Sequence, residues 1–110
     1  MTWTVDSSNT TTLTGSGTED TLVSGSTTNA TYVFKADLNN MVNGDIVEIR
    51  IYTKVLTGDT LRVAWKAAFA NIPVTKVVIS PPVPSDFSIK VTMTQQAGTG
   101  RSVTWSLLRI

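Results

Sequence analysis

The 110-residue chain contains neither histidine nor cysteine, and this absence removes most of the side chains on which enzyme chemistry depends. Without cysteine there is no disulfide framework and no thiolate nucleophile, and without histidine the serines lack their usual base. The only adjacent carboxylates, Glu19 and Asp20, lie in a polar stretch with no aromatic sugar shelf beside them, and no glycine-rich phosphate-binding motif is present. We therefore expect no enzyme, and no catalytic, cofactor-binding or metal-binding residues.

Charge and long apolar runs are also scarce. Charged residues make up 15% of the chain and the net charge is +1, which argues against a nucleic-acid partner because phosphate binding needs a concentrated basic surplus. No apolar run approaches the ~20 residues of a membrane span. Residues 1–4 have neither the basic nor the apolar region of a signal peptide. We expect one soluble domain with no membrane partner and no targeting signal.

The most informative stretch is Asp45–Ala70, where two runs of alternating residues flank one turn. Period-two alternation predicts two half-buried strands, with Thr57–Thr60 as the reversal. The inward sets are Val47, Ile49, Ile51, Thr53 and Val55 on the first run, and Leu61, Val63, Trp65, Ala67 and Phe69 on the second. A short Gly58–Thr60 loop places Val55 opposite Val63. A different loop would oppose Arg50 to Lys66, and like charges directly opposite are unfavourable, so we favour the first register.

The outer face of this predicted hairpin carries the main charged feature of the sequence. Its residues are Arg50, Lys54, Arg62 and Lys66, with Glu48 as the sole carboxylate and Tyr52 as an outward aromatic. Contact surfaces between proteins are enriched in Tyr and Arg, so this face is a candidate protein interface. A solvated strand face whose lysines discourage edge pairing is an equally good interpretation.

The N-terminal third is polar and the remainder is punctuated by turn residues. Residues 1–16 are predicted to form a polar arm or short edge strand, in which Trp3 is a further candidate for the protein interface. Residues 17–110 are predicted to form a single β-sandwich domain. Asp37 is expected to cap one helical turn that folds Leu38 and Met41 onto the core. A calcium loop at residues 37–45 is the weaker alternative, because the oxygen spacing does not match an EF-hand.

The C-terminal half adds further predicted strands. Residues 74–79 form one, and Phe87–Gln95 and Val103–Leu107 form a second hairpin around Ala97–Gly100, with the last strand ordered to the terminus. The prolines of Ser80–Ser85 are expected to exclude that segment from ladder pairing.

The complete set of predicted strands indicates an all-β fold. We expect an antiparallel β-sandwich or small jelly roll of seven to nine strands with no long helix, and an open barrel is less favoured. The aromatic residues expected in the core are Phe34, Trp65, Phe69, Phe87 and Trp105.

Several segments resemble small structural proteins of tailed bacteriophages, most closely capsid decoration (cement) proteins. They are Gly17–Leu22, Asn29–Phe34, Asp37-Leu38, Met41–Asp45, Lys54–Gly58, Gly98–Arg101, Trp105 and Leu107–Arg109. The resemblance implies a β-domain that lies on the outer surface of the phage head. During assembly it would be found in the cytoplasm of the bacterial host. It also implies the major capsid protein as partner and a homo-oligomer, often a trimer. No family site residue maps onto this chain.

Two alternatives to a decoration protein remain open at this stage. A tail, neck or fibre component would use the same fold in fewer copies. A carbohydrate-binding module would need an outward aromatic shelf, for which Trp3 and Tyr52 are the candidates.

Overall fold

The computed structural model describes residues 2–26, 29–86 and 88–110, and the regular structure in these segments consists of strands, with no helix. The expected core residue Phe87 lies outside the described residues. The strands are β1 (Thr4–Thr12), β2 (Glu19–Ser26), β3 (Ala30–Asp37), β4 (Ile46–Thr53), β5 (Arg62–Ala70), β6 (Val77–Ile79), β7 (Val83–Ser85), β8 (Ile89–Ala97) and β9 (Ser102–Arg109).

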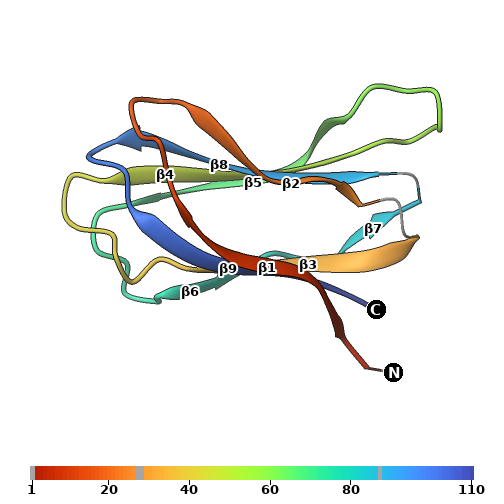
Figure 1. Ribbon diagram of the computed structural model, residues 1–110, viewed down its shortest axis with the longest axis horizontal. Coiled ribbons are helices and arrows are strands. Elements are labelled where there is room, and N and C mark those ends of the chain that lie inside the picture. Colours follow the sequence, from red (N-terminus) through yellow and green to blue (C-terminus); the bar gives the residue numbers. More distant parts are fainter. Residues whose placement is uncertain (1, 27–28, 87) are drawn as a thin grey trace.

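These strands form two antiparallel sheets that face each other across the core (Figure 1). One sheet has the order β1-β9-β3-β6, with β7 also paired to β3, and the other has the order β2-β8-β4-β5. The prediction of an all-β antiparallel sandwich without a long helix is confirmed. Both chain termini lie at the same end of the long axis as the loop between β4 and β5, in the opposite layer (Figure 1).

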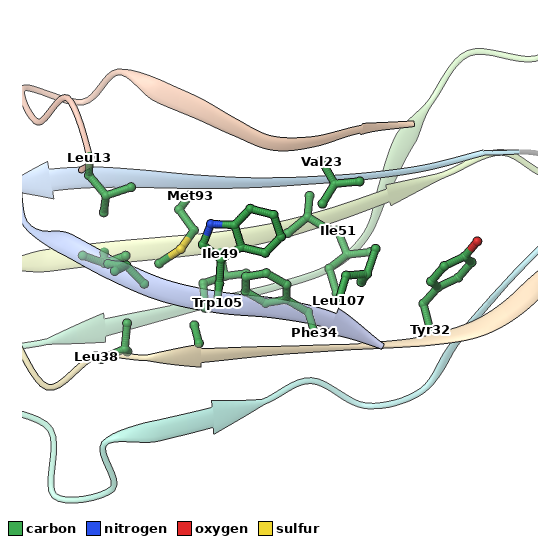
Figure 2. Packing of buried hydrophobic residues seen from close by; sticks show 14 of the residues in the cluster. Leu13, Val23, Tyr32, Phe34, Leu38, Ile49, Ile51, Met93, Trp105 and Leu107 are labelled. Carbon is green, nitrogen blue, oxygen red and sulfur yellow. The ribbon is translucent and has the colours of Figure 1, made fainter. Parts of the chain in front are cut away.

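The core is filled by the inward side chains of the inner strands. Ile49 and Ile51 of β4 and Met93 of β8 meet Phe34 and Trp105 of the facing sheet (Figure 2). Their exposed fractions do not exceed 5%, and the rings of Phe34 and Trp105 stack with centroids 6.1 Å apart. Trp65 and Phe69 are only half-buried, because β5 lies at the edge of its sheet. The core prediction is therefore confirmed for Phe34 and Trp105 but only partly for the two β5 aromatics.

The predicted register of the β4–β5 hairpin is wrong. Arg50 lies opposite Lys66 and Ile51 opposite Trp65, with a bulge between Ile51 and Tyr52. The strands end at Thr53 and begin again at Arg62, so the connection is the whole of residues 54–61 rather than a tight turn. Val55, expected to be inward, is 80% exposed in this loop. The like-charge pair is tolerated because Glu48 forms a salt bridge with Arg50.

The predicted second hairpin is also wrong, because β8 and β9 belong to different sheets. Residues 98–101 carry the chain from one layer to the other, and buried polar contacts hold this crossing in place. Gln95 donates to the carbonyl of Thr99 (2.6 Å) and accepts from the backbone N–H of Arg101 (2.9 Å). The Arg101 guanidinium then donates to the buried carboxylate of Asp45 (2.7 and 3.3 Å). The guanidinium lowers the pKa of Asp45 below its ordinary value.

Two shorter predictions have mixed outcomes. Asp37 does cap a turn, accepting from the backbone N–H of Asn39 (3.0 Å), and Leu38 and Met41 are buried, although the turn does not extend into a helix. The exclusion of residues 80–85 from the sheet is wrong for β7, where Pro84 lies opposite Thr31, while residues 80–82 lie outside the strands. An edge strand tolerates proline because one side of its backbone needs no partner.

The strand expected at residues 74–79 is limited to β6 (Val77–Ile79). No helix in the described segments is long and apolar enough to cross a membrane.

Candidate protein-interaction surface

The structure places the candidate contact residues in three locations. Arg50 and Tyr52 of β4 and Lys66 of β5 lie on the outer side of the β2-β8-β4-β5 sheet, with Arg50 directly opposite Lys66. Lys54 and Arg62 flank the loop of residues 54–61. Trp3 precedes β1 in the other sheet and is 43% exposed. The sequence-derived basic face is therefore divided between the sheet surface and the base of one loop.

The outer side of the sheet is a mixed-charge network rather than a purely basic face. Glu19 of β2 accepts a hydrogen bond from the hydroxyl of Tyr52 (2.5 Å) and another from the hydroxyl of Thr92 (2.6 Å). These two donors lower the pKa of Glu19, while Tyr52 and Glu48 raise the pKa of Arg50. The expectation that Glu48 is the only carboxylate on this face is wrong. The sequence could not show that β2 lies two strands away from β4.

Tyr52 is engaged on its ring as well as at its hydroxyl. The ammonium of Lys90, from β8, lies 5.1 Å from the centre of the Tyr52 ring, a cation–π distance. Lys90 was not among the candidate residues, although its outward position in the alternation of residues 87–95 was visible in the sequence. Since one face of the ring carries a cation and the hydroxyl is bonded to Glu19, Tyr52 does not present a free aromatic shelf.

Thr92 is a polar residue of the outer sheet face that this network buries. It lies opposite Arg50 and so belongs to the outer side, yet its side chain is fully buried. A buried hydroxyl needs a partner, and the Glu19 carboxylate supplies it. The network therefore stabilises the sheet face in addition to presenting charge to solvent.

The loop of residues 54–61 presents two strongly exposed apolar side chains. Val55 is 80% exposed and Leu56 is 67% exposed, and the loop projects beyond the neighbouring strands (Figure 1). A backbone hydrogen bond from Asp59 to Leu56 (3.0 Å) closes a turn inside the loop. Lys54 and Arg62 lie at the two bases of this loop, Lys54 next to Val55 in the chain and Arg62 opposite Thr53. Exposed apolar groups rimmed by charge are typical of protein contact sites.

A second apolar region follows one margin of the sandwich. The end of β5, β6 and the loop between them line an open hollow formed by Ala68, Phe69, Ala70, Pro73, Val74, Thr75, Val77 and Val78. Val74 is fully exposed and Ile79 is 61% exposed. The sequence pattern did not identify this margin, because its residues come from strands whose neighbours in space could not be assigned.

Among the described residues, no group of three or more carboxylates lies close enough together to hold a metal ion. The carboxylates described above already have internal partners. Asp45 is paired with Arg101, Glu48 with Arg50, and Glu19 with two hydroxyl groups. This arrangement is chemically suited to holding strands and to surface contact.

Comparisons with known proteins add little to this geometry. No family model and no curated protein matches the chain. Among solved structures, the crystal structure of the infectious bursal disease virus VP2 subviral particle is similar, with 17% sequence identity and a TM-score of 0.45. The match covers 98% of this chain but 31% of that one, so this chain spans about a third of its length. A likeness this weak bears on neither function nor partners, and the two-sheet fold is established by the strand pairing itself.

Proposed function

We propose that this protein is a capsid decoration protein of a tailed bacteriophage that binds the outer shell of the head and bridges neighbouring major capsid subunits. The sequence resemblance described above suggests the family. The observation that carries the proposal is the projecting loop of residues 54–61, where Val55 and Leu56 are 80% and 67% exposed and whose two bases carry the cations Lys54 and Arg62. We assign no catalytic role.

The position of this loop suits bridging. It lies at the same end of the long axis as the two chain termini, but in the opposite layer of the sandwich (Figure 1). Trp3, which is 43% exposed, and Ile110, which is 39% exposed, belong to the terminal segments. Two separated apolar contacts at one end would each occupy a neighbouring capsid subunit. Many copies around a shell turn such modest contacts into a stable lattice.

The chemistry of the loop indicates the kind of surface that it would contact. Val55 and Leu56 favour an apolar depression, and Lys54 and Arg62 favour carboxylates at its rim. Burying the exposed part of the two apolar side chains would contribute about 3 kcal/mol, which corresponds to about 150-fold in affinity. On the mixed-charge sheet face, Arg50 and Tyr52 already have partners inside the chain, so Lys66 would be the secondary contact.

The experiment begins with copy number. Mass spectrometry of virions purified from the phage that encodes the chain should give a copy number close to that of the major capsid protein. A handful of copies per particle would favour the tail, neck or fibre alternative. Absence from the particles would contradict a virion role and favour a soluble binding module.

A binding assay then tests the loop itself. Particles stripped of the protein are incubated with the wild type, with the double variant Val55→Ser/Leu56→Ser, or with the control Thr57→Ser in the same loop. We expect the double variant to lose about 150-fold in affinity without a change in melting temperature, since both side chains are exposed. Unchanged binding by the double variant would refute the assignment of the contact to this loop. Binding to glycans that Trp3→Ala abolishes would instead support the carbohydrate alternative.

A further inference from the structure

The β5 strand is a long sheet edge whose last six residues have little of the usual protection against pairing. It pairs with β4 on one side and with no other described strand on the other. Residues 65–70 are free of bulges and prolines and carry Lys66 as the only charge. Lys66 is thus the one residue in this stretch of a kind that discourages edge pairing, and the exposed row of backbone donors and acceptors is a template for another strand.

Lys66 is the residue that points to a partner. It lies directly opposite Arg50, an unfavourable like-charge arrangement, and Arg50 is compensated by its salt bridge to Glu48. Among the described residues Lys66 has no hydrogen-bond or ion-pair partner of its own. A carboxylate placed across the free edge would supply one.

We propose that β5 pairs antiparallel with β5 of a second copy of this chain, about a two-fold axis at Ala67, to give one continuous sheet. This pairing is independent of the decoration role proposed above. It predicts a dimer, whereas the phage resemblance implies a trimer. The axis must be perpendicular to the sheet, because only this orientation makes a strand antiparallel to its own copy and keeps inward residues facing inward.

Charge selects the register. With the axis at Ala67, Lys66 lies opposite Ala68 of the second copy, and the next strand beyond Ala68 carries Glu48 at the same level. Two strand spacings separate Lys66 from that Glu48, about 10 Å between Cα atoms, and the small alanine between them lets Lys66 reach the Glu48 carboxylate, which it would share with Arg50 of the second copy. An axis at Lys66 would instead oppose the two lysines. An axis at Trp65 or Ala68 would place no carboxylate level with Lys66.

The same register covers the apolar residues of the edge. On the inner side of the sheet, Trp65 lies opposite Phe69 of the second copy. By symmetry, Phe69 lies opposite Trp65 of the second copy. Both aromatics are only half-buried in the single chain. Cross-strand aromatic pairs stabilise sheets, and the pairing would also bring the second copy next to the apolar hollow beside Phe69.

The first test is the oligomeric state measured by sedimentation over a range of concentrations, together with two lysine variants. Ala68→Lys places a lysine opposite Lys66 of the second copy, while within its own chain it lies beside Glu48, so the fold is preserved. We expect this variant to raise the dimer dissociation constant about tenfold. The control Thr21→Lys adds the same charge to β2, the far edge of the sheet, and should leave the constant unchanged. A wild-type monomer at all concentrations, or equal effects of the two variants, would overturn the proposal.

The second test fixes the register by cysteine crosslinking, which the cysteine-free sequence makes clean. Ala67→Cys places the two thiols opposite each other, within the Cα separation of about 4.4–6.8 Å that a disulfide requires. Ala64→Cys, on the same strand, places them about 20 Å apart along the strands. We expect a disulfide-linked dimer from Ala67→Cys and none from Ala64→Cys under mild oxidation. Equal crosslinking of both variants, or crosslinking of Ala64→Cys alone, would refute the axis at Ala67.

Discussion

Replacing Asp45 by asparagine should destabilise the sandwich substantially, because this carboxylate fastens the crossing between the two sheets. Its side chain is 1% exposed and receives two hydrogen bonds from Arg101 and one from the backbone N–H of Val42 (3.0 Å). Removing one member of a buried ion pair costs about 3–5 kcal/mol. Arg101 is 28% exposed and can regain some hydration, so we expect the lower value, about 3 kcal/mol. For a domain of this size that corresponds to a fall of roughly 12 °C in melting temperature.

The pH dependence of the same variant provides the sharper assay. The folded-state pKa of Asp45 lies below its ordinary value of 3.8, so its stabilising contribution is complete well above that value and is lost as the pH falls through the folded pKa. The melting temperatures of wild type and Asp45→Asn should therefore differ widely at pH 7 and by less at about pH 2.5, which lies below the ordinary pKa of the carboxyl. A difference that is small at pH 7, or equally large at both values, would refute the reasoning.

Two further predictions concern single contacts. Tyr52→Phe removes a hydrogen-bond donor from Glu19, so the pKa of that carboxylate should rise toward its ordinary value of 4.5 in an NMR titration, and an unchanged pKa would contradict the assigned role of the hydroxyl. Gly98→Ala should cost about 2 kcal/mol more in unfolding free energy than Gly44→Ala. Both glycines have a positive φ, but only at residue 98 would the added methyl group collide with the Asp45 carboxylate; equal costs in denaturant melts would argue against this contact.

The sequence predicts the inward faces of individual strands well, because alternation is a local property. Val47, Ile49 and Ile51 are all buried as expected, and their burial follows from period two alone. The same property says nothing about where a strand ends. Val55 continues the alternation for one more step, but the chain has already left the sheet at Thr53.

Pairing between strands is the part that sequence reasoning could not supply. The segment Ala97–Gly100 has the composition of a hairpin turn, yet it joins two sheets, and what decides between these outcomes is the set of long-range contacts of Gln95, Arg101 and Asp45. The partner of Asp45 is 56 residues away in the sequence. Turn residues specify a change of direction, and tertiary contacts specify the layer in which the chain continues.

The candidate site was incomplete for the same reason. Arg50, Tyr52 and Lys66 were identified because they alternate outward on a recognisable hairpin, but Glu19 and Lys90 reach the same surface from β2 and β8. With these two residues included, most charges on the sheet face have partners inside the chain, and a face whose charges are satisfied has little to gain from a partner. Lys66 is the charged residue of this surface that has no partner inside the described part of the chain. Val55 and Leu56 are the apolar side chains of the loop that remain exposed. Association should therefore depend on the β5 edge and the projecting loop, and substitutions of Arg50 or Tyr52 should affect the stability of the sheet more than binding.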